Sequence, residues 1–163
     1  MLIGVVSDTH NNLKNIDHII TLFNEEEVDL VIHTGDITNK NSLKRFNQLQ
    51  CELIGVYGNN DKEELGLEEV AKRNNFKFQD PPFFLKLNGR EIIIFHEPDS
   101  VDEFIGKNPG LNLIIHGHTH RFRHETKNGV VIFNPGESAG MLKGKNAIGL
   151  IDLNNLAIKR IFF

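Results

Sequence analysis

The stretch HGHTH, from His116 to His120, concentrates three of the eight histidines of the chain in five positions. Carboxylate, amide and imidazole side chains also stand directly after several other apolar runs. The candidate metal ligands in these positions are Asp8, His10, Asp36, Asn59, His96, His118 and His120. Mixed oxygen and imidazole donors suit divalent transition metals better than calcium or magnesium. Seven ligands are too many for one ion with an open position, so the sequence predicts two ions that share a bridging carboxylate.

Two such ions would give the site a definite chemistry. A pair of divalent cations about 3.5–4 Å apart can clamp a phosphoryl group and lower the pKa of a water molecule between them. We therefore predict hydrolysis of phosphate esters, with manganese as the expected metal and nickel, iron, cobalt or zinc as alternatives. Competing catalytic motifs are absent, since the sequence has neither a glycine-rich phosphate loop nor a Gly-x-Ser-x-Gly motif.

Each candidate ligand, taken singly, has a structural explanation that needs no metal. Asp8 could cap a following helix, Asp36 could be a turn residue, and His96 could be a core histidine. These explanations would have to coincide at five strand ends, which favours one shared site. Alternate residues of an extended strand face the same side, so an extended backbone would direct His118 and His120 toward the metals.

The remaining histidines are expected to have structural roles. We expect His116 to end its strand as a core or supporting residue, and His33 to support Asp36. His18 and His124 are expected at the protein surface.

The pattern of apolar residues predicts the elements that must position the ligands. In the first half, strands and helices alternate in the order β-α-β-α-β, which predicts a parallel sheet. The expected strands are 2–6, 28–33 and 51–58, and the expected helices are 13–23, 43–49 and 67–71.

In the second half, Asn-Gly pairs at Asn88 and Asn128 predict two β-hairpins. A short helix is expected over 101–106, a buried strand over 111–116 and a last pair of strands within 146–163. Two sheets packed face to face, with helices outside, accommodate these elements in an α/β protein. Sites in such sheets form at the carboxyl ends of the strands, where the candidate ligands fall.

Length and composition exclude several classes of protein. A chain of 163 residues suits a single domain, 1–163, without a cap domain. The formal net charge of -4 disfavours stable nucleic-acid binding, and no apolar run is long enough to span a membrane. With Cys51 as the only cysteine, no internal disulfide can form, so we expect a cytoplasmic protein. A homo-oligomer is compatible with all of these features.

The motifs SDTHNN, HTGD, YGNND, FH, HGHTH and NPGE, in this order, resemble those of the calcineurin-like metallophosphoesterases, particularly the small YfcE-like phosphodiesterases. The resemblance extends from Met1 to about Asp152. It implies a four-layer α/β/β/α sandwich with two mixed sheets and a dinuclear metal centre. One metal would be held by Asp8, His10 and His120, the other by Asn59, His96 and His118, with Asp36 bridging both.

The resemblance also implies an activity, the hydrolysis of small phosphodiesters by attack of a metal-bound hydroxide. The candidate catalytic residues are then Asp36, Asn59, Asn60 and His118. Two alternatives are a phosphomonoesterase with the same metals and a non-catalytic, protein-binding scaffold like the retromer subunit built on this fold.

The sequence departs from the family pattern twice. Asn60 replaces a histidine that can protonate the leaving group, and HEP, 96–98, replaces His-Gly.

Overall fold

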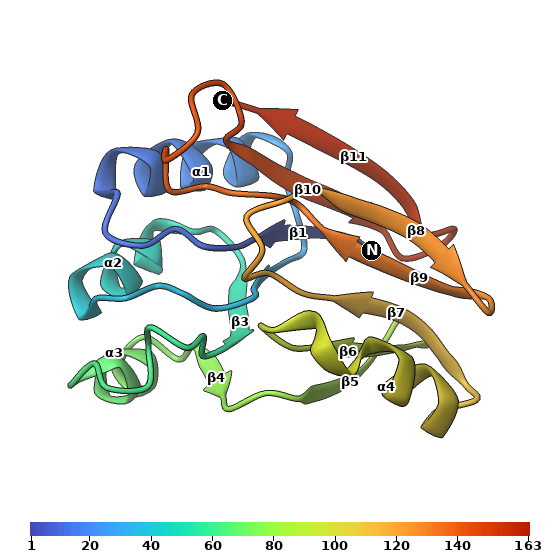
Figure 1. Ribbon diagram of the computed structural model, residues 1–163. Coiled ribbons are helices and arrows are strands. Elements are labelled where there is room, and N and C mark those ends of the chain that lie inside the picture. The colour runs from blue at the N-terminus through green and yellow to red at the C-terminus, as the bar shows by residue number, and fades with distance from the viewer.

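Two β-sheets packed face to face form the centre of the protein in the computed structural model, which describes residues 1–163 (Figure 1). The first sheet contains β1 (Leu2–Val6), β2 (Leu30–His33), β3 (Glu52–Val56), β4 (Lys77–Gln79), β10 (Ala147–Asp152) and β11 (Ala157–Phe162). Its strand order is β11-β10-β1-β2-β3-β4. The strands β1 to β4 are parallel, as predicted for the first three, whereas β10 is antiparallel to both β1 and β11.

The second sheet is also mixed. It contains β5 (Phe83–Leu87), β6 (Arg90–Ile94), β7 (Leu111–Ile115), β8 (Arg123–Lys127) and β9 (Val130–Asn134). Its order is β5-β6-β7-β9-β8, with a parallel centre of β6, β7 and β9 and an antiparallel strand at each edge. Both predicted hairpins are present, and both residues of each Asn-Gly pair have positive φ angles, as a two-residue hairpin turn requires.

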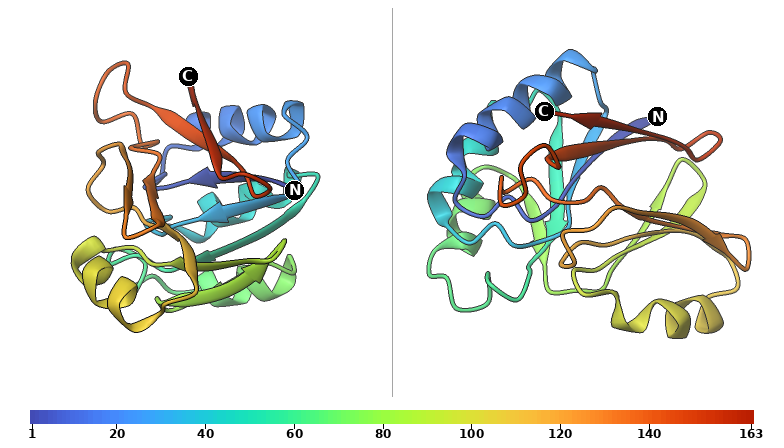
Figure 2. Two further views of the ribbon diagram at one scale, coloured as in Figure 1. Left: turned by 90° about the vertical axis from the view of Figure 1, so that its right-hand side faces the viewer. Right: turned by 45° about the horizontal axis from the view of Figure 1, so that its top comes forward.

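Three apolar layers hold the fold together. The helices α1 (Leu13–Glu25), α2 (Lys40–Arg45) and α3 (Leu67–Arg73) cover the outer face of the first sheet. A second layer of buried residues, including Ile32 and Ile115, fills the space between the two sheets. The helix α4 (Val101–Lys107) covers the outer face of the second sheet through Val101 and Ile105. Figure 2 shows α1 and α4 on opposite sides of the molecule with the strands between them. The predicted four-layer α/β/β/α sandwich is therefore confirmed.

Alternation along β1 explains why its apolar run is continuous. Ile3 and Val5 face the second sheet, whereas Val6 faces the helices. A strand buried on both faces needs apolar residues at successive positions. None of the helices combines the length and apolar character that crossing a membrane requires.

Two elements differ from the sequence prediction. The second helix ends at Arg45 and tightens into a short 3-10 turn, Phe46–Gln48, instead of continuing to Leu49. The strand β4 was not predicted, because three residues at the edge of a sheet carry too short a pattern to detect.

Parallel strands bring the candidate ligands together. The loops after β1, β2 and β3 carry Asp8, Asp36 and Asn59, and the loops after β6 and β7 carry His96 and His118. These five strands belong to the parallel parts of the two sheets, so the loops after them can meet at one edge of the sandwich.

Candidate metal centre

The backbone of the site is unusual because five candidate ligands have positive φ angles. Asp8, His10, Asp36, His118 and His120 have φ values of 52°, 46°, 58°, 67° and 54°. Left-handed backbone is uncommon for residues other than glycine and gathers at functional sites. The backbone at His118 and His120 is therefore not extended, so the two side chains do not share one face of a strand. A bend directs the two rings toward different groups of ligands.

The first group of ligand atoms comes from Asp8, His10 and His120. One ligand atom from each of these residues lies within 4.8 Å of the other two. The Nε2 atom of His120 lies 3.6 Å from Oδ1 of Asp8. The other oxygen of Asp8 accepts hydrogen bonds from the hydroxyl of Ser7 and from the backbone N–H of His118. Asp8 is thus held by one oxygen, and the other faces the group.

The second group surrounds Nε2 of His96. This atom lies 3.0 Å from Oδ1 of Asn59, 3.2 Å from Nδ1 of His118 and 3.4 Å from Oδ1 of Asp36. The Nδ1 atom of His118 also lies 3.0 Å from Oδ1 of Asn59. All four side chains therefore direct polar atoms at one small volume.

Asp36 lies between the two groups. Its Oδ1 atom faces His96, and its Oδ2 atom lies 4.0 Å from Nε2 of His10. Asp8 also adjoins the second group, since ligand atoms of Asp8, Asp36 and His96 lie within 4.8 Å of one another. The seven predicted ligands thus form two adjacent groups.

The hydrogen bonds of these residues leave ligand atoms free for divalent cations. Oδ1 of Asp8 and Nε2 of His10 are buried and have no hydrogen-bond partner in the protein. Such atoms are destabilising unless something satisfies them. Nδ1 of His96 lies 2.8 Å from the carbonyl oxygen of Thr34, which can only accept. Nδ1 therefore carries the proton, and the lone pair of Nε2 faces the second group, as in metal-binding histidines.

Electrostatics also favour a cation here. Burial raises the pKa of Asp8. Burial acts in the same direction on Asp36, but hydrogen bonding and charge from His96, with hydrogen bonds from Asn60, hold its pKa below the usual range. For His96, burial disfavours the imidazolium, yet Asp36 and Asp8 raise its pKa above the ordinary value. The two carboxylates thus attract positive charge to the space between them.

Two glycines permit the close approach of the ligand loops. A Cβ atom on Gly117 would lie 2.0 Å from Oγ of Ser7 and 3.0 Å from Oδ2 of Asp8. A Cβ atom on Gly58 would lie 2.2 Å from Oδ1 of Asp36. Any larger residue at either position would displace a candidate ligand.

The sequence motifs and this geometry match a known family. The model of the calcineurin-like phosphoesterase superfamily domain matches residues 1–156. The chain belongs to this superfamily.

Relatives of this phosphoesterase include enzymes of known class. The chain is 36% identical over 163 residues to phosphodiesterase MJ0936 of Methanocaldococcus jannaschii, with 99% of this chain and 98% of the relative covered. It is 25% identical over 176 residues to phosphodiesterase YfcE of Escherichia coli, with 97% and 91% covered. The predicted family and the predicted enzyme class, a metal-dependent phosphoric ester hydrolase, are therefore confirmed.

Solved structures agree with this assignment. The structure of an archaeal phosphodiesterase matches with a TM-score of 0.91 at 36% identity, over 100% of both chains. Vps29 of Entamoeba histolytica, complexed with Zn²⁺, matches with a TM-score of 0.69 at 16% identity, over 99% of both chains. The second likeness shows a shared fold alone.

Both the backbone and the side chain of Asn60 form hydrogen bonds with Asp36 in this phosphoesterase. Its backbone N–H lies 3.0 Å from Oδ1 of Asp36, and its side-chain Nδ2 lies 2.7 Å from Oδ2. Asn60 therefore donates to both oxygens of Asp36 and fixes the carboxylate between the two groups.

Two buried carboxylates that support the site were missing from the predicted ligand set. Asp61 accepts hydrogen bonds from the backbone N–H groups of Asp36, Thr38 and Gly58, and so joins the loops after β2 and β3. Glu137 is fully buried, and its Oε2 atom lies 3.6 Å from Nδ1 of His120. Asp61 stands near the end of a predicted strand, and no spacing rule links Glu137 to a histidine in another loop.

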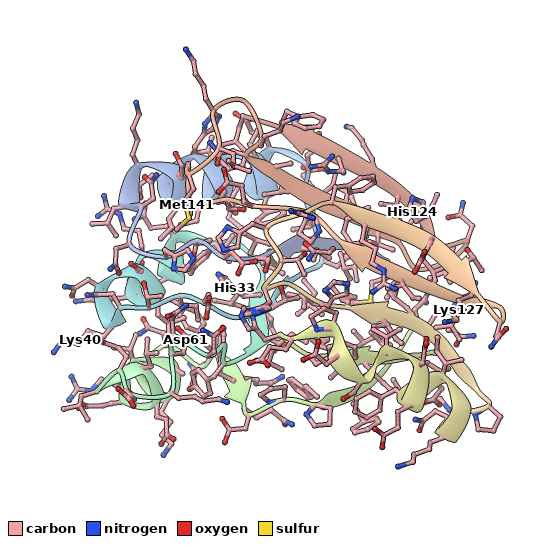
Figure 3. The ribbon with its side chains drawn as sticks, in the orientation of Figure 1. His33, Lys40, Asp61, His124, Lys127 and Met141 are labelled. Atoms are coloured by element: carbon pink, nitrogen blue, oxygen red, sulfur yellow. The ribbon has the colours of Figure 1, made fainter.

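The histidines outside the two groups of ligand atoms pack in the core or lie at the surface. His116 is buried, stacks on Phe95 with ring centroids 6.1 Å apart, and has a pKa lowered by burial to about 4. His33 does not contact Asp36, because its Nδ1 accepts from the N–H of Gly35 and its Nε2 lies 3.0 Å from the hydroxyl of Thr9. Figure 3 shows His33 and Asp61 near the centre of the molecule, with His124 on β8, away from both.

Asn134 organises the HGHTH loop from β9. Its Nδ2 atom donates to the carbonyl of Gly117 at 2.9 Å and to the hydroxyl of Thr119 at 3.2 Å. Its Oδ1 atom accepts from the N–H of Gly136. Asn134 thus supports the loop that carries His118 and His120.

Proposed function

We propose that this calcineurin-like phosphoesterase is a phosphodiesterase that hydrolyses small diesters with two divalent transition-metal ions. The observation that carries the proposal is the position of Asp36, whose two oxygens face two adjacent groups of ligand atoms. One ion would bind to Asp8, His10 and His120, the other to Asn59, His96 and His118, with Asp36 between them. Manganese is the first candidate, with nickel, iron, cobalt and zinc as alternatives.

Bound divalent ions would polarise the phosphoryl oxygens and activate water for hydrolysis. The chain itself supplies rigidity to this reaction. Asn60 holds both oxygens of Asp36, and Asp61 holds its backbone N–H. Pre-oriented groups cost little reorganisation when charge develops in the transition state. Asn59 and His118 are exposed, so they are the candidate ligands nearest an incoming substrate.

Preference for a diester is supported by the charge next to the site. Glu97 is exposed and lines a groove together with Asn59 and His96. A carboxylate in this position repels a dianionic monoester more strongly than a monoanionic diester. We also propose that residues 1–163 form one metallophosphoesterase domain without a cap, which would leave the site open to small substrates.

The test compares hydrolysis of bis(4-nitrophenyl) phosphate with that of 4-nitrophenyl phosphate by the manganese-loaded protein. We expect kcat/KM for the diester to exceed that for the monoester by at least about tenfold, or 1.4 kcal/mol. Glu97→Gln should raise the relative rate on the monoester. Glu25→Gln removes an exposed charge at the end of α1 and should leave the ratio unchanged.

Two results would contradict this proposal. A faster reaction with the monoester would identify a phosphomonoesterase. A protein that binds metal but hydrolyses neither compound would instead support a non-catalytic scaffold.

A further inference from the structure

A groove adjoins the candidate metal ligands Asn59 and His96 and extends beyond them. Its volume is about 230 Å³, and Asn59 and His96 form one end of its lining. The other lining residues are Tyr57, Gly58, Lys62, Pro81, Pro82, Phe95, Glu97, Ser100 and Phe104. Figure 1 shows the connection from β4 to β5, which includes both prolines, passing from the first sheet to the second. The groove therefore lies where the two sheets adjoin the site.

Three aromatic residues, Tyr57, Phe95 and Phe104, provide the apolar part of the groove lining. Phe104 is half-buried on α4 and is held by Phe95, with ring centroids 5.5 Å apart, and by Phe84, at 6.0 Å. Tyr57 is half-buried as well and packs on Phe78. Rings that are fixed by their neighbours lose little conformational freedom when a ligand stacks on them. These rings are thus prepared to contact another planar group.

Charged and polar side chains also line the groove, among them Lys62, Glu97 and Ser100. Lys62 is exposed, so its ammonium group can interact with an anionic ligand. Ser100 also lines the groove, and its side chain makes no capping hydrogen bond at the start of α4. A cavity of about 150 Å³ can hold a benzene molecule, so this groove has room for a single ring.

We propose that this groove is the subsite for a planar aromatic substituent of the diester, either an aryl group or a single-ring nucleobase. The inference rests on the proposed function, since it assigns a place to one arm of the proposed substrate. The groove begins at Asn59 and His96, so a phosphoryl group at the metal centre would direct one ester arm along it. The aromatic rings of Phe104 and Tyr57 would then contact the planar substituent of the diester, edge to face or stacked.

The test measures binding of phenylphosphonate and ethylphosphonate to the manganese-loaded protein by calorimetry. Both probes carry the same anionic group, and neither has an ester bond that the enzyme could hydrolyse. We expect phenylphosphonate to bind at least about tenfold more tightly, as is typical of aromatic stacking. Phe104→Ala should reduce this ratio to about two or three, while changing the affinity for ethylphosphonate little.

Phe162→Ala is the matched control, because Phe162 is an exposed phenylalanine on β11 in the other sheet. This variant should show the same ratio of affinities for phenylphosphonate and ethylphosphonate as the unmodified protein. If Phe104→Ala does not fold, Phe104→Leu keeps apolar volume on α4 and should still lower the ratio. Equal binding of both probes by the unmodified protein, or a ratio that survives loss of the Phe104 ring, would overturn the subsite.

Hydrolysis of bis(4-nitrophenyl) phosphate by the same preparations separates this inference from the proposed function. An active enzyme that binds the two probes equally would refute the subsite and leave the function standing. An inactive enzyme that prefers phenylphosphonate through Phe104 would refute the function and leave the aromatic subsite standing.

Discussion

The Nδ1 atom of His120 lies 3.6 Å from Oε2 of Glu137, a carboxylate with no exposure to solvent. The Nε2 atom of the same ring faces Asp8 across 3.6 Å. Glu137 also accepts hydrogen bonds from the backbone N–H groups of Met141 and Leu142. A carboxylate behind a metal-binding histidine fixes the tautomer and orientation of the ring. This contact links His120 to a loop distant in sequence.

Glu137→Gln should weaken metal binding because the amide cannot stabilise the His120 ring as a carboxylate does. Loss of such a partner typically reduces affinity about 10–100-fold. Calorimetric titration of metal-free protein with Mn²⁺ measures this change. Ser138→Ala alters the neighbouring buried residue and should leave the affinity unchanged. Equal affinities in the unmodified protein and the Glu137→Gln variant would show that Glu137 only anchors the loop.

The three histidines of HGHTH should respond differently to substitution by alanine. His118→Ala and His120→Ala should each lower kcat by at least about a hundredfold, because each removes a proposed ligand. His116→Ala should instead lower the free energy of unfolding by on the order of 1–3 kcal/mol, since it removes a buried ring stacked on Phe95. Urea unfolding and steady-state kinetics on the same variants separate the two effects. Equal losses of kcat at matched stability would refute the assignment.

The rate of hydrolysis should depend steeply on the pKa of the leaving group. Asn60 has no titratable proton near neutral pH, and its amide is engaged by Asp36. A positioned general acid is typically worth about 10²–10⁴-fold in rate, which alkoxide leaving groups would forgo here. A graded series of aryl and alkyl diesters measures the dependence. A flat profile, with the chemical step shown to limit the rate, would mean that another residue protonates the leaving group.

The metal-free protein should become less stable as the pH is lowered, and His33 should account for part of this loss. Burial lowers the pKa of His33 to about 3, whereas in the unfolded chain it is about 6.5. Between these two pH values His33 is protonated in the unfolded chain but neutral in the folded protein. The free energy of unfolding therefore increases with rising pH in this window and decreases as the pH falls. The contribution of His33 is about 1.4 kcal/mol per pH unit.

Urea unfolding between about pH 4 and 6 tests this contribution. The slope of the free energy of unfolding against pH should be smaller in His33→Gln than in the unmodified protein. His18→Gln removes an exposed histidine and serves as the control. Identical slopes in His33→Gln and the unmodified protein would contradict the prediction.

Much of the fold could be predicted because its strands are buried on both faces. Apolar runs such as 2–6 and 113–115 indicate buried strands, and each Asn-Gly pair identifies a hairpin turn. The edge strand β4 escaped because its three residues alternate between half-buried and exposed positions in a polar stretch. Its place depends on pairing with β3, which is a tertiary contact.

The candidate site was predictable in composition but not in backbone shape. Ligand types recur at strand ends, so all seven residues could be selected before their positions were known. The left-handed backbone at His118 and His120 could not be foreseen, because it depends on tertiary hydrogen bonds. Asp8 accepts from the backbone N–H of His118, and Asn134 donates to the carbonyl of Gly117. The contact between Glu137 and His120 has the same origin in tertiary packing.

The number of metal ions bound per chain tests the central claim most directly. Metal-free protein would be titrated with Mn²⁺ by calorimetry, and the manganese content of the saturated protein would be measured by elemental analysis. The position of Asp36 between the two groups of ligands predicts two ions per chain. Saturation at a single ion would contradict the dinuclear centre and the mechanism proposed from it.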